Sequence, residues 1–187
     1  MSGFSPITRM TIPKHPLVDQ LRFTRREFMR AIRGISAGDA VVRIMPMNYL
    51  SRNVGHLAWQ EQRYFLHFGQ GITPFPDIAK EFAYGAPAST PSLDRVIKAW
   101  KTITRAADPW LDTLTSDVLS ARAVSKGKEV AYTHGNLLQR TIYHYWYHTG
   151  ENMAIRQQLG NGSLPQFVGN LDDFAPYRTD RPDPDST

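Results

Sequence analysis

The chain has 187 residues, of which 41% are hydrophobic and 21% are charged. This length and composition allow a folded domain with its own core and exclude a wholly disordered protein. Cysteine is absent, which excludes disulfides, thiolate zinc sites, iron–sulfur clusters and a cysteine nucleophile. The net charge of +5 attracts anions in general and identifies no partner.

No run of apolar residues is long enough for a membrane span or for the core of a signal peptide. We therefore expect a soluble, cytoplasmic protein without a membrane partner.

The first part of the chain carries the patterns of two helices. Residues 1–16 hold three prolines and are expected to form an irregular lead-in. Apolar residues at three- and four-residue steps predict a helix from Leu17 to about Gly38. After an extended link, a proline-free amphipathic stretch predicts a second helix from about Asn48 to Phe68, with Gly69-Gln70-Gly71 as its stop.

The middle of the chain is rich in proline. Residues 71–90 predict a long crossover with one turn of helix near residues 77–82. Thr90 and Pro91 are typical of a helix start and predict a third helix there. Pro109 predicts a kink in that helix, or a restart capped by Asp108. Residues 117–132 are expected to be extended and turn-like around Lys126-Gly127-Lys128.

The last long pattern predicts a helix from about His134 to Leu159, with Thr133 as its cap. Four long helices, a long second connection and no convincing pair of strands predict an all-α four-helix bundle over residues 17–160. Residues 161–187 are expected to lie over the surface or to be disordered.

Histidine spacing is the most informative feature for function. His144 and His148 are four residues apart, so both imidazoles project from one face of the fourth helix, the face that also carries apolar residues. Two inward imidazoles need partners, and a divalent metal ion would satisfy both. A third ligand should come from another helix, and His56 on the second helix is the best candidate.

A purely structural alternative remains open at this point. The two histidines lie within a tyrosine- and tryptophan-rich stretch and are also compatible with an aromatic core layer bonded to tyrosine hydroxyls. His67 is eleven residues beyond His56, about 16 Å along the helix axis, and is too distant to share one ion with it.

Several polar residues near these histidines are candidates for the rest of a site. Asn53 and Gln60 lie about one turn from His56 and are expected to line a pocket for a cofactor or substrate. Tyr145 is expected either to wall that pocket or to belong to the core. Glu151, three residues after His148, is the candidate catalytic acid or base, or an orienter of His148. Glu61 lies well round the helix from His56 and is expected to be exposed.

Arginines line one face of the first helix at three- and four-residue steps: Arg22, Arg26, Arg30 and Arg33, with Arg25 beside them. Such a row can meet phosphates, but no nucleic-acid motif accompanies it. We interpret it as a solvated outer face and consider a nucleic-acid partner unlikely.

Two short motifs together resemble a known family. They are Asn53-Val54-Gly55-His56-Leu57-Ala58-Trp59 and His144-Tyr145-Trp146-Tyr147-His148-Thr149-Gly150-Glu151. This pairing is similar to the DinB-like superfamily of metal-binding four-helix bundles. The resemblance implies that His56, His144 and His148 bind a divalent metal ion, with the small residue Gly150 in its usual place after the last ligand.

The same resemblance implies a function and partners. Relatives include transferases and isomerases that use bacillithiol, mycothiol or glutathione, so we expect a metal-dependent thiol S-transferase acting on a small-molecule substrate, and a homodimer. Three histidines without cysteine suit zinc, nickel or iron(II). The alternatives are a non-catalytic protein that binds a metal or a small ligand, and a metal-dependent hydrolase.

Overall fold

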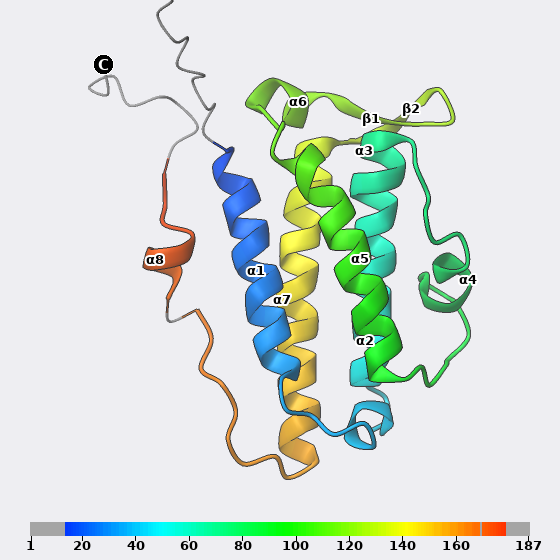
Figure 1. Ribbon diagram of the computed structural model, residues 1–187, viewed down its shortest axis with the longest axis vertical. Helices are drawn as coiled ribbons and strands as arrows, with labels where there is room; N and C mark the ends of the chain where they lie inside the picture. Colours follow the sequence, from blue (N-terminus) through cyan, green and yellow to red (C-terminus); the bar gives the residue numbers. More distant parts are fainter. Residues whose placement is uncertain (1–13, 169, 179–187) are drawn as a thin grey trace, which may run out of the picture.

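A computed structural model describes residues 14–168 and 170–178 of the chain. Four long helices run side by side: α1 (Pro16–Ile32), α2 (Leu50–Glu61), α5 (Leu93–Leu111) and α7 (His134–Gln158). Figure 1 shows that α1 and α7 run in one direction and α2 and α5 in the other. Helix α1 packs on α7, and α2 packs on both α5 and α7. The predicted all-α four-helix bundle is confirmed.

Helix α1 starts where the sequence predicts and ends early. Pro16 is its first residue, and the ring of His15 accepts a hydrogen bond from the backbone N–H of Leu17. The helix ends at Ile32 rather than near Gly38 because the chain turns at Gly34, whose φ of +76° is a left-handed conformation that favours glycine.

The second predicted helix is one helical rod with an internal change of winding. Helix α2 continues into a π-helical segment, η2 (Gln62–His67), and a short helix, α3 (Phe68–Gln70). The rod ends at Gly71, which has a φ of +73°, so the predicted stop is confirmed. The widened turn begins directly after Glu61, and periodicity alone did not indicate it.

The crossover to α5 carries the predicted turn of helix, α4 (Ile78–Phe82). Helix α5 begins at Leu93, after Ser92 rather than at Thr90 and Pro91. It continues through Pro109 and ends two residues later, so the predicted restart at Asp108 was wrong. A proline so close to the end of a helix removes one N–H bond and leaves little helix to disrupt.

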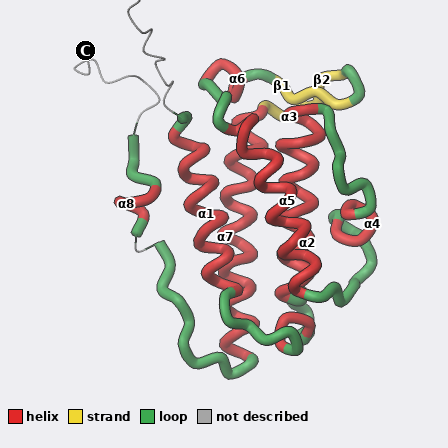
Figure 2. The backbone as a smooth tube through the Cα atoms, in the orientation of Figure 1, coloured by secondary structure: helices red, strands yellow, loops and turns green. Residues whose placement is uncertain are grey.

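The segment before α7 corrects the expectation of no paired strands. A short helix, α6 (Ser116–Ser120), leads into an antiparallel hairpin of β1 (Arg122–Ser125) and β2 (Lys128–Thr133) that covers one end of the bundle (Figure 2). Lys126 and Gly127 both have positive φ, as a tight hairpin turn requires. Most side chains of the two strands are not buried, so alternation of apolar residues gave little signal.

Helix α7 begins as predicted, because the hydroxyl of Thr133 accepts the N–H of Asn136 at 3.2 Å. Beyond it, the described tail includes a short helix, α8 (Leu171–Phe174). This tail lies along α1 (Figure 1): the amide of Gln20 donates to the carbonyl of Ala175 at 2.7 Å. Most of the predicted lead-in, residues 1–13, and residues 179–187 lie outside the described residues.

The four helices bury one continuous apolar core. Its fully buried members include Leu21 and Phe28 of α1, Leu57 of α2, Ile103 of α5 and Leu138 of α7. Among the described residues, no helix combines the length and the apolar character that crossing a bilayer requires.

Candidate metal centre

Three histidines from two helices meet between α2 and α7; we call His56, His144 and His148 the histidine cluster. One ring nitrogen from each lies within 4.8 Å of the others. The Nε2 atoms of His144 and His148 are 3.0 Å apart. The ring of His56 stands nearly perpendicular to both, with centroids 5.0 Å from His144 and 5.5 Å from His148. The structure thus brings together the three residues that the sequence singled out.

Hydrogen bonds on the far side of two rings fix which nitrogen faces the centre. Nδ1 of His56 lies 2.7 Å from the carbonyl oxygen of Phe82, and Nδ1 of His148 lies 2.8 Å from Oε2 of Glu151. Both oxygens accept hydrogen bonds, so each Nδ1 carries the proton and each Nε2 presents its lone pair inward. This is the arrangement of histidines that ligate metals.

The protonation of the rings, including that of His144, and their spacing decide whether a metal ion fits the cluster. Burial is the main cause that lowers the pKa of His144, to about 3, and the neighbouring His148 is the second. Burial also lowers the pKa of His56. These imidazoles are therefore neutral near pH 7, the state that metal binding needs. Nitrogens that share a tetrahedral ion at about 2.0–2.1 Å lie about 3.3 Å apart. The spacing of the cluster fits a divalent ion.

Glu151 sits behind His148 and is held by three donors. Oε2 accepts from Asn53 Nδ2 at 2.9 Å as well as from His148, and Oε1 accepts from the backbone N–H of Asn48 at 3.2 Å. Burial alone would raise the pKa of Glu151, but these hydrogen bonds hold it below its usual value. Glu151 is therefore an ionised carboxylate that orients His148. Asn53 is fully buried in the same group and also donates to Asn152.

The crossover supplies a part of the site that sequence reasoning missed. The ring of Phe82 lies against Gly55, where an added Cβ would be 2.4 Å from a ring atom. The guanidinium of Arg52, one turn earlier, donates to the carbonyl groups of Glu81, Ala86 and Pro87. These contacts bring the carbonyl of Phe82 to His56. A backbone acceptor leaves no trace in side-chain patterns, so no signal in the sequence pointed to Phe82.

An open hollow of about 570 Å³ adjoins the cluster between α2 and α7. Gln60 and His144 line it, together with Asn136, Gln139, Arg140 and Tyr143. Trp59 packs beside His56 with ring centroids 5.3 Å apart, and Tyr147 beside His148 at 5.1 Å. The histidines thus lie next to an open hollow whose lining residues carry polar groups, and between two aromatic rings.

Tyr145 is in a different place, deep in the core. Its hydroxyl donates to Glu61 Oε1 at 2.7 Å and accepts from Trp100 Nε1 at 2.5 Å. Burial and Glu61 raise the pKa of Tyr145 well above its ordinary value, so the hydroxyl keeps its proton. Its ring packs edge-on against Phe28. These contacts match the core alternative and tie Tyr145 to a network separate from the histidines.

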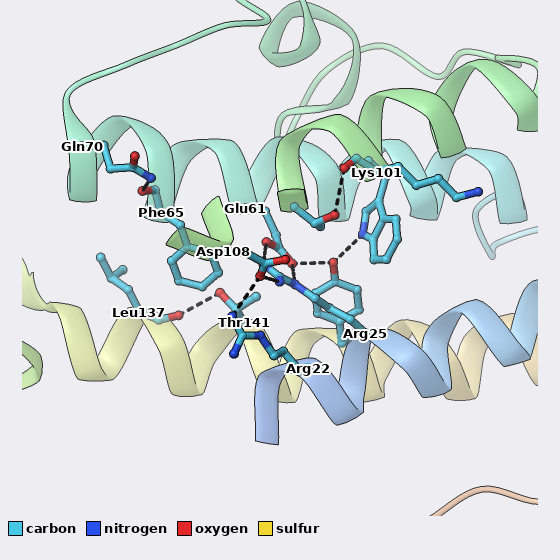
Figure 3. A network of polar contacts seen from close by, with 12 residues as sticks. Arg22, Arg25, Glu61, Phe65, Gln70, Lys101, Asp108, Leu137 and Thr141 are labelled. Carbon is cyan, nitrogen blue, oxygen red and sulfur yellow. Dashed lines mark hydrogen bonds and ion pairs between the residues drawn. The ribbon is translucent and has the colours of Figure 1, made fainter. Parts of the chain in front are cut away.

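That network corrects two expectations about charged residues. Glu61, expected to be exposed, is fully buried, and Arg25, expected on a solvated face, is 5% exposed. Nε of Arg25 donates to Glu61 Oε1 at 2.7 Å, Nη2 bonds to Oε2, and Nη1 bonds to Asp108 Oδ1 at 2.8 Å (Figure 3). Glu61 raises the pKa of Arg25 despite the opposing effect of burial. Arg25, Glu61 and Asp108 lie on three different helices, so the sequence around Arg25 or Glu61 did not indicate its partners.

The other arginines of α1 also make contacts within the chain. Arg22 pairs with Asp112 at 2.7 Å, Arg30 pairs with Glu27, and Arg26 lies over the ring of Phe174. His67 is outside the cluster, with Nε2 3.0 Å from the hydroxyl of Ser125. Its predicted distance from His56 is consistent with that position.

Fold and site together define a class: a four-helix bundle whose three converging histidines fit a divalent metal ion. The family model of the DinB superfamily matches residues 20–151, a range that contains all three histidines. The chain belongs to the DinB superfamily, as its two motifs indicated. No curated protein sequence matches it.

Proposed function

We propose that this protein is a divalent-metal-dependent transferase that joins a low-molecular-weight thiol to a small electrophile. The observation that supports this most is the convergence of three imidazoles beside an open hollow. A site made of three histidines leaves room for a further ligand, as catalytic rather than structural metal sites do. The metal candidates are zinc, nickel and iron(II), and the thiol candidates are bacillithiol, mycothiol and glutathione.

A divalent ion held by the cluster supplies the Lewis acidity that ionises a thiol near neutral pH. The protein's part is to hold His56 and His148 in position through Phe82 and Glu151. We assign Glu151 as a positioning residue rather than a base, because both of its oxygens already accept hydrogen bonds. Trp59 and Tyr147 pack beside the rings of His56 and His148.

The proposed reaction balances without an added oxidant or reductant. The thiol gives up its proton to solvent at the open hollow, and the sulfur lone pair forms a new bond to the electrophilic carbon. The bond from that carbon to the leaving group breaks, and its electron pair departs with the leaving group. Water in place of the thiol would make the same site hydrolytic.

Metal analysis of protein purified without a chelating resin tests the first half of the proposal. We expect about one ion per chain in the wild type and in His67→Ala, which removes a histidine outside the cluster, and loss of the ion in His144→Ala and His148→Ala. Equal metal content in all four proteins would contradict the assigned site.

Turnover tests the second half. Consumption of thiol with a panel of small electrophiles should depend on the bound ion and disappear in His144→Ala. Metal-loaded wild-type protein that consumes no thiol across the panel would favour the alternative of a non-catalytic binding protein. Release of product from water alone would favour the hydrolase. A homodimer, suggested by the family resemblance, and a cytoplasmic location, suggested by the sequence, are further parts of this proposal.

A further inference from the structure

The hollow beside His144 has a chemical character of its own. Besides His144, its lining residues are Gln60 of α2 and Asn136, Gln139, Arg140 and Tyr143 of α7. All of them carry a polar group, and Arg140 carries a full charge. This character bears on which thiol the site accepts, a question that rests on the proposed function.

Gln60 is the residue that marks the hollow as a binding site. Its side chain is only 5% exposed, and its Oε1 has no hydrogen-bond partner among the described residues. A buried amide oxygen without a partner destabilises a fold, and such groups are uncommon in native proteins. Gln60 lies about one turn after His56 on α2, and it lines the same hollow as His144.

Arg140 supplies the charge. It lies one helical turn before His144 on α7, about 6 Å along the axis. Its guanidinium lies 4.7 Å from the ring centre of Tyr132, on the hairpin. None of the ion pairs found within residues 14–168 and 170–178 includes Arg140. Arg140 is therefore oriented by an aromatic ring and has its donors available to an anion.

We propose that the thiol substrate carries a carboxylate, and that Arg140 binds this carboxylate while the sulfur reaches the histidine cluster. The planar guanidinium fork matches a carboxylate with two parallel hydrogen bonds. One arginine balances one negative charge, and the other polar lining groups are neutral, which favours a carboxylate over a doubly charged phosphate. Asn136, Gln139 and Gln60 provide neutral hydrogen-bonding groups for the rest of the molecule.

A matched pair of probes tests this proposal: 6-mercaptohexanoate and 6-mercaptohexan-1-ol, which have the same length and differ in one charge. Their chains can span one helical turn, about 5.4 Å. Binding is measured on cobalt(II)-loaded protein through the sulfur-to-cobalt absorption band, so the readout does not depend on turnover. We expect the wild type to bind the carboxylate about tenfold more tightly than the alcohol, the effect of a charge-assisted bidentate contact.

Two substitutions of Arg140 and one control complete the experiment. Arg140→Gln should equalise the two affinities and leave the affinity for the alcohol unchanged. Arg140→Glu should reverse the preference, so that 6-aminohexane-1-thiol binds better than the carboxylate. Arg105→Gln, which removes the same charge from the exposed face of α5, should keep the tenfold ratio.

Each contrary outcome has a distinct meaning. Equal affinities in the wild type, or a preference that survives in Arg140→Gln, would overturn the carboxylate assignment and leave the proposed function intact. If neither thiol produces the absorption band on the loaded protein, the proposed function fails, and this inference fails with it.

Discussion

Two groups of polar side chains lie between the helices, and they differ in how completely their hydrogen bonds are made. In the arginine–glutamate network, formed by Arg25, Glu61, Trp100, Asp108 and Tyr145, the charged and polar groups pair with one another. In the histidine cluster, Nδ1 of His144 has no partner among the described residues, and two Nε2 atoms face each other.

The difference separates a structural role from a functional one. Buried polar groups that form hydrogen bonds with one another rigidify a fold. Buried polar groups without such partners are usually explained by a ligand, an ion or water that the fold itself does not provide. Each group draws on α2, where Glu61 is five residues after His56. One helix thus carries both a completed network and an incomplete one.

The largest expected effect is in the completed network. Glu61→Leu should lower the free energy of unfolding by about 3–5 kcal/mol, because it leaves the Arg25 guanidinium buried without its main partner. Urea unfolding measures this loss. The double substitution Arg25→Met with Glu61→Leu should recover most of it, since neither charge then remains buried.

An exposed ion pair provides the control for that measurement. Arg122 and Glu129 are 4.0 Å apart with side chains 56% and 71% exposed, so Glu129→Leu should have a far smaller effect. A Glu61→Leu protein as stable as the wild type would show that the network contributes nothing to stability and does not differ from the histidine cluster in this respect.

A smaller loss is expected from Tyr145→Phe. The substitution deletes the hydroxyl that joins Trp100 to Glu61 and leaves the buried N–H of Trp100 without its acceptor, at a cost of about 1–2 kcal/mol. Metal content should not change, because Tyr145 belongs to the network and not to the cluster. Reduced metal content in a folded Tyr145→Phe protein would instead support its predicted role in cofactor binding.

The smallest effect, and the only one with the opposite sign, is expected in the cluster. In metal-free protein, His144→Leu should leave the free energy of unfolding unchanged or raise it by at most about 1 kcal/mol, because it removes an imidazole whose buried Nδ1 has no hydrogen-bond partner among the described residues and whose Nε2 contacts only His148. Thermal and urea unfolding in the presence of a chelator measure this change. Leu138→Ala on the same helix should lose about 2–5 kcal/mol as an ordinary core truncation. A comparable loss of unfolding free energy in His144→Leu would show that the histidine cluster stabilises the fold as the arginine–glutamate network does.

The sequence predicted most of the bundle and the centre of the site for a common reason. Helical periodicity and four-residue spacing are local properties, so the four long helices and the pair His144 and His148 were visible along the chain. His56 was the best candidate for a third ligand from another helix, and the resemblance of its neighbours to a family motif supported it. The structure brings all three together.

What the sequence did not reveal depends on contacts between distant segments. Glu61 was expected to be exposed because it lies well round the helix from His56, and its partner Arg25, on another helix, could not be identified from the sequence around it. Phe82 contributes a backbone carbonyl, which every residue type provides, and the hairpin of residues 122–133 is too exposed to show a clear alternation. The π-helical turn after Glu61 depends on packing rather than on local preference.

Arg52, Gly55 and His56 attach the crossover to α2 over a single helical turn, so the centre includes a loop as well as two helices. A transfer of the three histidines into another helical scaffold would also need residues 81–87. Alanine at the position of Gly55 would prevent this, because its Cβ would clash with the ring of Phe82.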